Sequence, residues 1–203
     1  MDVPCIYIIK HAISCEESIK LQNYLDSLAF IQYKTHLWGR DINVPRKQLM
    51  LCERDIEYRY NDIKMKTIKW NDEIKNIPKI YLPWIKESFN CALVNLYRNG
   101  DDHISPHRDD LRSHSNNAII SVSLGATRIF VLSENRERSP YYLCHNQQNI
   151  LEERNEIKFE IILEDGDIVC FNRSFNELFK HSIKKEKSVM TPRYNLTFRN
   201  LIN

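Results

Sequence analysis

His107-Arg108-Asp109 is a triplet of residue types that can bind a transition metal. In an extended backbone, side chains two positions apart lie on the same face, so the imidazole of His107 and the carboxylate of Asp109 can reach one ion. A third ligand is needed, and His181 is the candidate. Two histidines and one carboxylate hold Fe(II) and leave positions open for a co-substrate and oxygen. Most His-x-Asp triplets lie on the solvated surface of a protein, so other features of the chain must show whether this one binds a metal.

A second polar pattern occupies residues 193–199, Arg-Tyr-Asn-Leu-Thr-Phe-Arg. Strand alternation places Leu196 and Phe198 on one face and puts four polar residues on the other: Arg193, Asn195, Thr197 and Arg199. If that face is solvated, it is an ordinary polar side. If it faces the inside of a barrel, the buried guanidinium groups require anionic partners, and a dicarboxylate would supply them. Asn95 and Tyr97 repeat the alternation upstream of the triplet.

Further motifs accompany these residues in a fixed order along the chain. They are Asn95-Leu96-Tyr97, Gly100, His107-Arg108-Asp109-Asp110, Ser123-Leu124-Gly125-Ala126-Thr127-Arg128, His181 and Arg193 to Arg199. In order and spacing the set resembles the AlkB family of Fe(II)- and 2-oxoglutarate-dependent dioxygenases. Upstream, three more motifs resemble the animal AlkB homologues that repair alkylated bases in duplex DNA: Val44-Pro45-Arg46-Lys47-Gln48, Tyr58-Arg59-Tyr60 and Trp70. The resemblance spans about residues 37 to 203.

This resemblance implies a reaction and a set of site residues. Fe(II) would be held by His107, Asp109 and His181, with 2-oxoglutarate chelating the iron and O2 as the oxidant. The co-substrate residues would be Asn95, Tyr97, Arg193, Asn195, Thr197 and Arg199. Among them, Arg193 would pair with the distal carboxylate and Arg199 would neutralise the carboxylate near the metal. The implied reaction removes N-methyl groups from DNA bases such as 1-methyladenine and 3-methylcytosine, releasing formaldehyde and succinate.

The resemblance also implies a lid that recognises the target nucleotide. Trp38 would act as a wedge that fills the gap left by a flipped base in duplex DNA. Tyr60 would stack on the flipped base, Tyr58 would line its pocket, and Arg46 would hold the lid or the DNA. The pattern of residues 37–60 alone favours a different interpretation, a loop-rich edge with an exposed tryptophan and ordinary packing of the tyrosines.

Two positions near the ligands depart from the family pattern. Asp110 would recognise the amino group of the lesion, but Leu111 follows it where the nearest relatives tend to carry glutamate. One polar contact of the base pocket is therefore missing. Phe179 replaces a tryptophan two residues before His181, which changes packing.

Basic residues gather in two loops, at Lys184, Lys185 and Lys187 and at Arg136 and Arg138. In the resembling enzymes these loops touch phosphates, which adds salt-dependent affinity without sequence preference. A short lysine run is otherwise a solvated face. The net charge of +2 permits nucleic-acid binding without demanding it.

The bulk properties predict one intracellular domain. A chain of 203 residues suits a single domain. Its six cysteines form no Cys-x-x-Cys pair, which indicates reduced thiols and no structural zinc. No apolar run reaches the length of a membrane span, and the N-terminus lacks a signal-peptide pattern. We expect a monomer in the nucleus or cytoplasm, with no membrane partner.

The first half of the chain contains two helical patterns. Ser14 and Glu17 form a capping box that begins a helix. A second helix lies within residues 70–89, where Pro78 and Pro83 should break or kink it.

The second half is dominated by strand patterns. Residues 120–124 alternate as a half-buried strand. Residues 157–163 and 168–171 flank Asp165-Gly166 in the manner of a hairpin, and no helical pattern follows residue 90. The predicted class is α+β, mainly β. It comprises a double-stranded β-helix, or jelly-roll, core over residues 91–203, with an N-terminal helical layer and the lid within residues 1–90 of a single dioxygenase domain.

Two other functions remain open. One is an AlkB-type demethylase of RNA or single-stranded nucleic acid, in which the lid grips a strand without a wedge. The other is a non-catalytic nucleic-acid-binding protein on this fold. The complete metal triad and the two interior arginines argue against the second, because a binding protein has no physical need for them.

Overall fold

The structure, a computed structural model, describes residues 3–37, 39–54, 59–60, 63–110, 115, 117–135 and 158–202. It does not describe the side chains of residues 37, 59, 60 and 63. Several sequence-based interpretations therefore lie outside the described residues, namely those of Trp38, Tyr58, Leu111, Arg136, Arg138 and the side chain of Tyr60.

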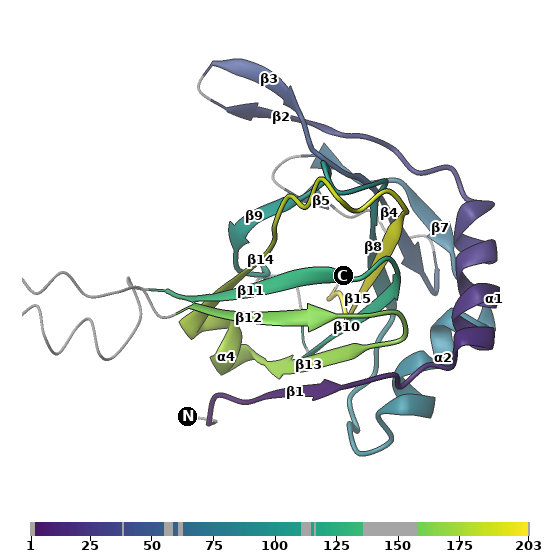
Figure 1. The fold of residues 1–203 in the computed structure, drawn as a ribbon. Coiled ribbons are helices and arrows are strands. Elements are labelled where there is room, and N and C mark those ends of the chain that lie inside the picture. Colours follow the sequence, from purple (N-terminus) through teal and green to yellow (C-terminus); the bar gives the residue numbers. More distant parts are fainter. Residues whose placement is uncertain are drawn as a thin grey trace, which may run out of the picture.

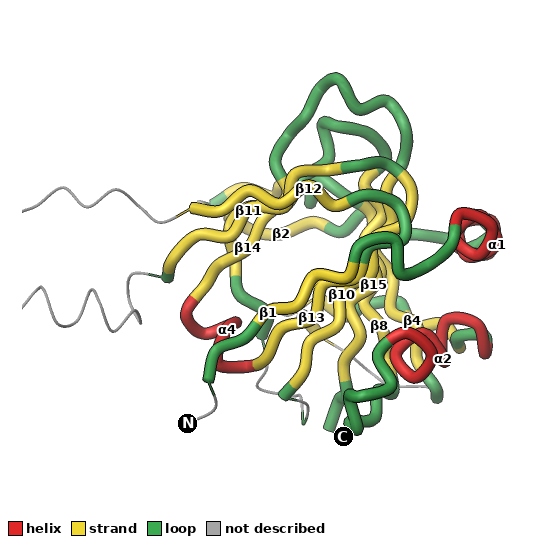
Figure 2. The backbone as a smooth tube through the Cα atoms, turned by 60° about the horizontal axis from the view of Figure 1, so that its bottom comes forward, coloured by secondary structure: helices red, strands yellow, loops and turns green. Residues whose placement is uncertain are grey.

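Two β-sheets form the body of the molecule, and Figure 2 shows them as two layers. The larger sheet has seven strands in the order β1-β13-β10-β15-β8-β4-β7, and only the β4–β7 pair is parallel. The strands are β1 Ile6–Ile9, β13 Ile168–Asn172, β10 Ala118–Gly125, β15 Arg193–Arg199, β8 Cys91–Tyr97, β4 Lys47–Cys52 and β7 Thr67–Lys69. Because β1, β4 and β7 belong to this sheet, residues before 91 build part of the sandwich itself.

The smaller sheet has four antiparallel strands in the order β12-β11-β14-β9. They are β12 Lys158–Leu163, β11 Arg128–Glu134, β14 Phe179–Ile183 and β9 Ile104–His107. Between the sheets lies an apolar cluster that includes Phe130, Leu132, Leu163, Val169, Phe171 and Ile183. Phe130, Phe171 and Ile183 of this cluster also border a pocket that is lined by polar side chains.

The expected hairpin of residues 157–163 and 168–171 is wrong. Strand β12 pairs with β11, whereas β13 pairs with β1 and β10, so the chain crosses from one sheet to the other at the Asp165-Gly166 turn. Gly166 has φ of 82°, and a Cβ there would lie 2.2 Å from the carbonyl oxygen of Ile13. The alternation of each strand was visible in the sequence, but alternation does not identify the neighbouring strand.

Two helices cover the outer face of the large sheet (Figures 1 and 2). Helix α1, Cys15–Asp26, begins with the predicted capping box of Ser14 and Glu17. Helix α2, Asp72–Tyr81, continues through Pro78 and ends before Pro83. Their apolar side chains pack on the sheet residues Val94, Val122 and Leu196. Among the described residues, no helix is long and apolar enough to cross a membrane.

The packing corrects the expectation of a half-buried strand at residues 120–124. Ile120, Val122 and Leu124 of β10 face the helices, while Ser121 and Ser123 are 8% and 1% exposed on the opposite face. Both faces of this strand are therefore buried. Serines on an apparently solvent-facing side instead lie between the sheets, because a second sheet covers them.

The sequence predicted no helix after residue 90, but the structure has a short one there. Helix α4, Arg173–Leu178, follows β13, and the side chain of Asn172 accepts a hydrogen bond from Phe175 N at 2.9 Å as its N-cap. Six residues are too few to give a periodic apolar pattern, so the sequence offered no helical signal.

Residues 34–64 contain more strand than the loop-rich interpretation allowed. Strands β2 Lys34–Leu37 and β3 Arg40–Asn43 form a hairpin that projects from the body (Figure 1). Strand β4 follows, and β5 Arg59–Tyr60 pairs with β6 Ile63–Lys64.

Candidate metal centre and co-substrate pocket

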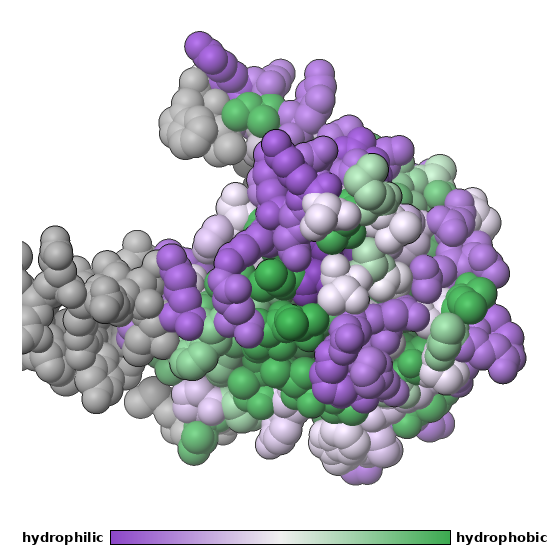
Figure 3. Space-filling model, in the orientation of Figure 1, coloured by the Kyte–Doolittle hydropathy of each residue, from purple (hydrophilic) through white to green (hydrophobic). Residues whose placement is uncertain are grey.

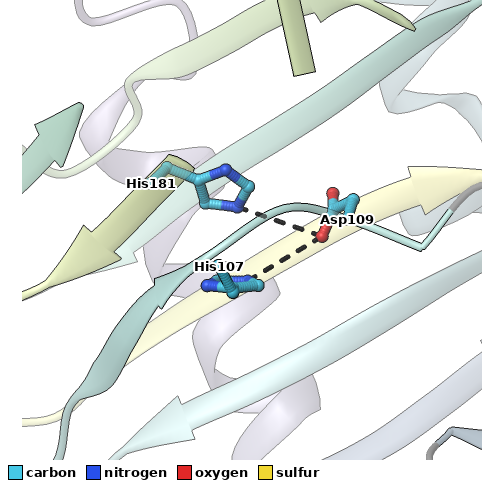
Figure 4. A group of neighbouring side chains, drawn as sticks. All are labelled: His107, Asp109 and His181. Atoms are coloured by element: carbon cyan, nitrogen blue, oxygen red, sulfur yellow. Dashed lines mark ion pairs between the residues drawn. The ribbon is translucent and has the colours of Figure 1, made fainter. Parts of the chain in front are cut away.

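Three candidate metal ligands lie together on the small sheet and the loop beside it (Figure 4). His107 ends β9 and is the ladder partner of His181 in β14, while Asp109 follows two residues after the end of β9. The Nε2 atoms of both histidines lie 3.9 Å from Asp109 Oδ1, and the ligand atoms all lie within 4.8 Å of one another. Small side-chain movements would bring them onto one ion at the metal–ligand distance of about 2 Å.

The two histidines are held in the form that binds a metal. Nδ1 of His107 lies 3.0 Å from the carbonyl oxygen of Ser105, so an N–H there donates to the backbone and leaves Nε2 with a lone pair. Burial lowers the pKa of His107, and burial together with the neighbouring His107 lowers the pKa of His181 to about 3. Both rings are therefore neutral at neutral pH, as metal ligation requires.

Asp109 is fixed at both its carboxylate and its backbone. Nη2 of Arg199, a residue only 3% exposed, lies 2.8 Å from Asp109 Oδ1. The backbone N–H of Asp109 donates to Asn176 Oδ1 at 3.0 Å, and Asn176 Nδ2 donates to Asp109 O at 2.9 Å. The arginine thus pairs with the carboxylate by charge as well as by hydrogen bonding.

A polar pocket extends from these ligands between the two sheets. The polar face of β15 lines it with the residues that alternation assigned to that face: Arg193, Asn195, Thr197 and Arg199. Neighbouring strands add Asn95 and Tyr97 from β8, and Arg46 and Gln48 from the β4 region. Asn195 and Asn95 are direct partners across the β15–β8 ladder, as are Arg193 and Tyr97. The structure thus brings every candidate co-substrate residue into one pocket with the metal ligands.

Arg193 is a buried cation with unused hydrogen-bond donors. It is 1% exposed, and its guanidinium carbon lies 5.4 Å from the ring centre of Tyr97. Nη2 donates to Ser123 Oγ at 2.8 Å, but Nε and Nη1 have no hydrogen-bond partner among the residues that the structure describes. Burial lowers its pKa to about 10, which leaves it protonated at neutral pH. Among the described residues, no carboxylate lies within ion-pair distance of it.

A buried, charged donor without a partner is costly, so this position calls for an anion. A carboxylate could accept from Nε and Nη1 together, in the two-pronged geometry that arginine favours. The metal ligands at the other side of the pocket would hold the second end of such a molecule. A keto acid with two carboxylates, such as 2-oxoglutarate, therefore fits the donor set.

Asn95 is oriented by two residues of the segment before β8. Its Oδ1 accepts from Arg46 Nε at 2.9 Å and from Gln48 Nε2 at 2.8 Å. The amide oxygen is thereby engaged, which leaves the Asn95 NH2 group as the donor to the pocket. Arg46 is only 8% exposed. The structure thus places Arg46 inside the pocket rather than on the projecting hairpin.

The amide of Asn195 is engaged within the protein. Its Nδ2 donates to Ser121 Oγ at 2.7 Å and to Val122 O at 3.1 Å, while Thr197 Oγ1 donates to its Oδ1 at 3.3 Å. These bonds hold the floor of the pocket in one arrangement.

Three further candidate residues are Asp110, Tyr60 and Lys184. Asp110 follows the candidate ligand Asp109 and is half-buried. Tyr60 lies in β5, but its side chain is not described. Lys184 pairs with Glu160 of β12, so this lysine is already engaged in an ion pair.

Sequence reasoning missed several polar residues of the site, among them Gln48, Ser123 and Asn176. Gln48 stood within a motif already quoted and lies two positions from Arg46, so strand alternation could have placed both on one face. Ser123 shares a face with Ser121 by the same rule. Nothing in the sequence pointed to Asn176, because its helix gave no signal.

Comparison with known proteins agrees with this geometry. The profile of the 2OG-Fe(II) oxygenase superfamily matches residues 5–199. The human DNA oxidative demethylase ALKBH2 is 29% identical over 186 residues, covering 90% of this chain and 65% of the relative. The human alpha-ketoglutarate-dependent dioxygenase alkB homolog 3 is 30% identical over 161 residues, covering 78% of this chain and 53% of the relative. The chain therefore spans about two thirds and one half of these two proteins.

A solved structure shares the fold. The structure of OsALKBH1 superposes with a TM-score of 0.64 at 16% identity, and the match covers 98% of this chain and 100% of that one. At this level of identity the likeness concerns the arrangement of the strands and helices.

Proposed function

Because the chain belongs to the 2OG-Fe(II) oxygenase superfamily, we propose that it demethylates N-alkylated bases in DNA, such as 1-methyladenine and 3-methylcytosine, by oxidation. Bound Fe(II), with 2-oxoglutarate and O2, supplies the oxidising chemistry. One oxygen atom enters the methyl C–H bond and the other enters succinate, with loss of CO2. The resulting N-hydroxymethyl group breaks down to formaldehyde and the N–H of the repaired base.

One observation carries the proposal: the unpaired donors of Arg193 and the His107–Asp109–His181 group line the same pocket. In the proposed complex, Arg193 receives the distal carboxylate of the co-substrate, with Asn95 and Tyr97 beside it. Arg199 sits next to Asp109 and offsets negative charge close to the metal. The protein's part is to position these groups and to keep water from the reacting atoms.

The choice of DNA rests on the relatives and on the shape of the molecule. ALKBH2 is named a DNA oxidative demethylase. The β2–β3 hairpin stands off the body on the side where β9 lies (Figure 1), and the space-filling view shows a hollow between the hairpin and the body (Figure 3). Its side chains Lys34, His36 and Arg40 are exposed. We propose that the hairpin is the lid and that Lys34 and Arg40 meet the phosphate backbone.

Within that lid, we propose that Trp38 is the wedge that replaces a flipped base, with Tyr58 and Tyr60 at the pocket for that base and Asp110 at its amino group. Enzymes that act on a base must take it out of the stack, and an inserted aromatic ring offsets the lost stacking.

A turnover assay tests the proposal. The protein, with Fe(II), ascorbate and 2-oxoglutarate, is given oligonucleotides that carry 1-methyladenine, as single strand and as duplex. Repaired base and succinate are measured together, with His181→Ala as the inactive control. Coupled repair and succinate support the DNA demethylase. Succinate production that is stimulated by methylated RNA alone would move the substrate to RNA, and the absence of both products would contradict the proposed activity.

Comparison of Trp38→Ala with the unchanged protein tests the wedge. Base stacking contributes about 1–3 kcal/mol per base, so the variant should lose roughly 5- to 100-fold on duplex and much less on single strands. Equal losses on both substrates would exclude a wedge role for Trp38.

A further inference from the structure

The metal ligand Asp109 lies outside the sheet that holds the other two ligands. His107 and His181 face each other in the β9–β14 ladder, which fixes both backbones. Strand β9 ends at His107, so Asp109 is beyond the last ladder pair. A loop residue that must present a carboxylate at a fixed place requires another constraint on its backbone.

Asn176 provides that constraint from a different part of the chain. Its side-chain amide accepts from Asp109 N at 3.0 Å and donates to Asp109 O at 2.9 Å, so it uses both hydrogen-bonding groups of one residue. Asn176 is only 3% exposed. Its side chain therefore hydrogen-bonds to the Asp109 backbone at a buried position, where few water molecules compete for the N–H and C=O groups of Asp109.

The helix that carries Asn176 is itself anchored. At its start, Asn172 Oδ1 accepts from Phe175 N at 2.9 Å and from Cys5 N at 3.1 Å, and Asn172 Nδ2 donates to Val3 O at 2.7 Å. The ring of Phe175 stacks on that of Phe179 with 4.6 Å between centroids. Helix α4 is thus held to the segment before β1 on one side and to the core on the other.

We infer that Asn176 is a positioning residue for the metal centre: it fixes the backbone of Asp109 so that the carboxylate faces His107 and His181. Arg199 acts on the carboxylate itself, and Asn176 acts on the peptide that carries it. Among the described residues, neither Asn176 nor another residue of helix α4 belongs to the candidate ligand group. The inference rests on the metal site of the proposed function and extends it by one residue.

Metal affinity, measured without turnover, tests this role. Apoprotein is titrated with Co(II), followed by the visible absorption of the bound ion and by calorimetry. Loss of a residue that orients a ligand typically costs about 10- to 100-fold in metal affinity. We expect a loss of this size in Asn176→Ala, with an altered Co(II) spectrum.

Asn135→Ala is the matched control. Asn135 is also fully buried and also bonds to helix α4, since its Nδ2 donates to Glu177 O at 3.0 Å. It should lower the unfolding temperature in EDTA as Asn176→Ala does, yet bind Co(II) like the unchanged protein. Equal affinity in Asn176→Ala and the unchanged protein, or equal losses in the two variants, would show that Asn176 only stabilises the helix and would overturn the inference.

Amide hydrogen exchange in the unchanged protein tests the same contact without a substitution. The Asp109 amide should be protected despite its place in a loop, and rapid exchange there would also overturn the inference. Both measurements are independent of the nucleic-acid substrate. A failure to repair methylated DNA, together with the expected change in Co(II) affinity, would remove the substrate proposal and leave the role of Asn176 in place.

Discussion

His107 and His181 are ladder partners on adjacent strands, and their ring centroids lie 4.3 Å apart. Residues distant in the sequence thus become direct neighbours through one pair of strands. Burial keeps both rings neutral, and Asp109 completes the group from the loop. The metal site therefore depends on the pairing of β9 with β14.

His107→Ala should abolish turnover and leave the fold intact. In the proposed site the ring of His107 is a ligand at the surface of the pocket, whereas the strands are held by their backbone pairing and by the core. Metal affinity should fall by more than about 100-fold, beyond the usual effect of residues that only orient ligands. Metal content, circular dichroism and succinate production measure the three quantities, and a variant with substantial activity would contradict the assignment of the triad.

Replacement of Arg193 should weaken co-substrate binding selectively. Arg193→Met removes the donors proposed for the distal carboxylate, and charge-assisted hydrogen bonds of this kind contribute about 1.5–3 kcal/mol. The KM for 2-oxoglutarate should rise roughly 10- to 100-fold with a smaller change in kcat. Arg193→Lys keeps the charge without the planar fork, so it should recover only part of the affinity. A normal KM in Arg193→Met would place the carboxylate elsewhere.

Without the co-substrate, the Arg193→Met substitution should not lower the stability of the protein. Arg193 is a buried cation with no carboxylate partner in the described part of the chain, and an apolar side chain of similar volume often removes such a desolvation cost. We expect the unfolding free energy of Arg193→Met without 2-oxoglutarate to equal or exceed that of the unchanged protein. Urea denaturation with and without the co-substrate measures this, and a large loss of stability in its absence would show that Arg193 serves the fold.

Gln48→Leu tests the orientation of Asn95. The substitution removes one of the two donors to Asn95 Oδ1 and leaves the bond from Arg46. A neutral hydrogen bond contributes about 1 kcal/mol, so the affinity for 2-oxoglutarate should fall about 3- to 10-fold. Gln32→Leu is the control, because Gln32 bonds to Val44 O outside the pocket. Equal effects of the two substitutions on 2-oxoglutarate affinity would contradict an orienting role for Gln48.

Asp167 should make stability depend on pH in the acid range. Burial raises the pKa of its carboxyl, but hydrogen bonds from Glu164 N, Lys10 Nζ and His11 N outweigh burial and lower the pKa below its ordinary value. The unfolded chain therefore binds more protons than the folded one, so stability rises with pH in this window. The contribution is fully present above about pH 5 and is lost as pH falls through the folded pKa.

Urea denaturation between pH 7 and pH 2 measures that contribution. Asp167→Asn should lose about 1–3 kcal/mol at pH 7 and show a flatter pH profile. Glu53→Gln, which breaks an exposed ion pair with Lys75, should change stability by less than about 1 kcal/mol. Parallel profiles for Asp167→Asn and the unchanged protein would rule out Asp167 as the source.

The sequence by itself determined the features that depend on neighbours along the chain. The capping box joins Ser14 and Glu17, which are three positions apart in the sequence. The polar face of residues 193–199 follows from the two-residue period of a strand. Both were correct because local geometry fixes them. For the metal ligands the sequence supplied a prediction by resemblance to a known set, and the structure brings the three predicted residues together.

Tertiary structure alone decided which segments meet. Strand alternation gives the faces of β12 and β13 but not their partners, so the expected hairpin was wrong and the chain instead crosses between sheets. The alternation in β10 suggested that its serine face is exposed to solvent, but in the structure the second sheet covers that face. Asn176 illustrates the same limit at the metal centre: its bonds to Asp109 join residues 67 positions apart, through a helix too short to leave a pattern. Such contacts arise from packing between distant segments, and local periodicity does not encode them.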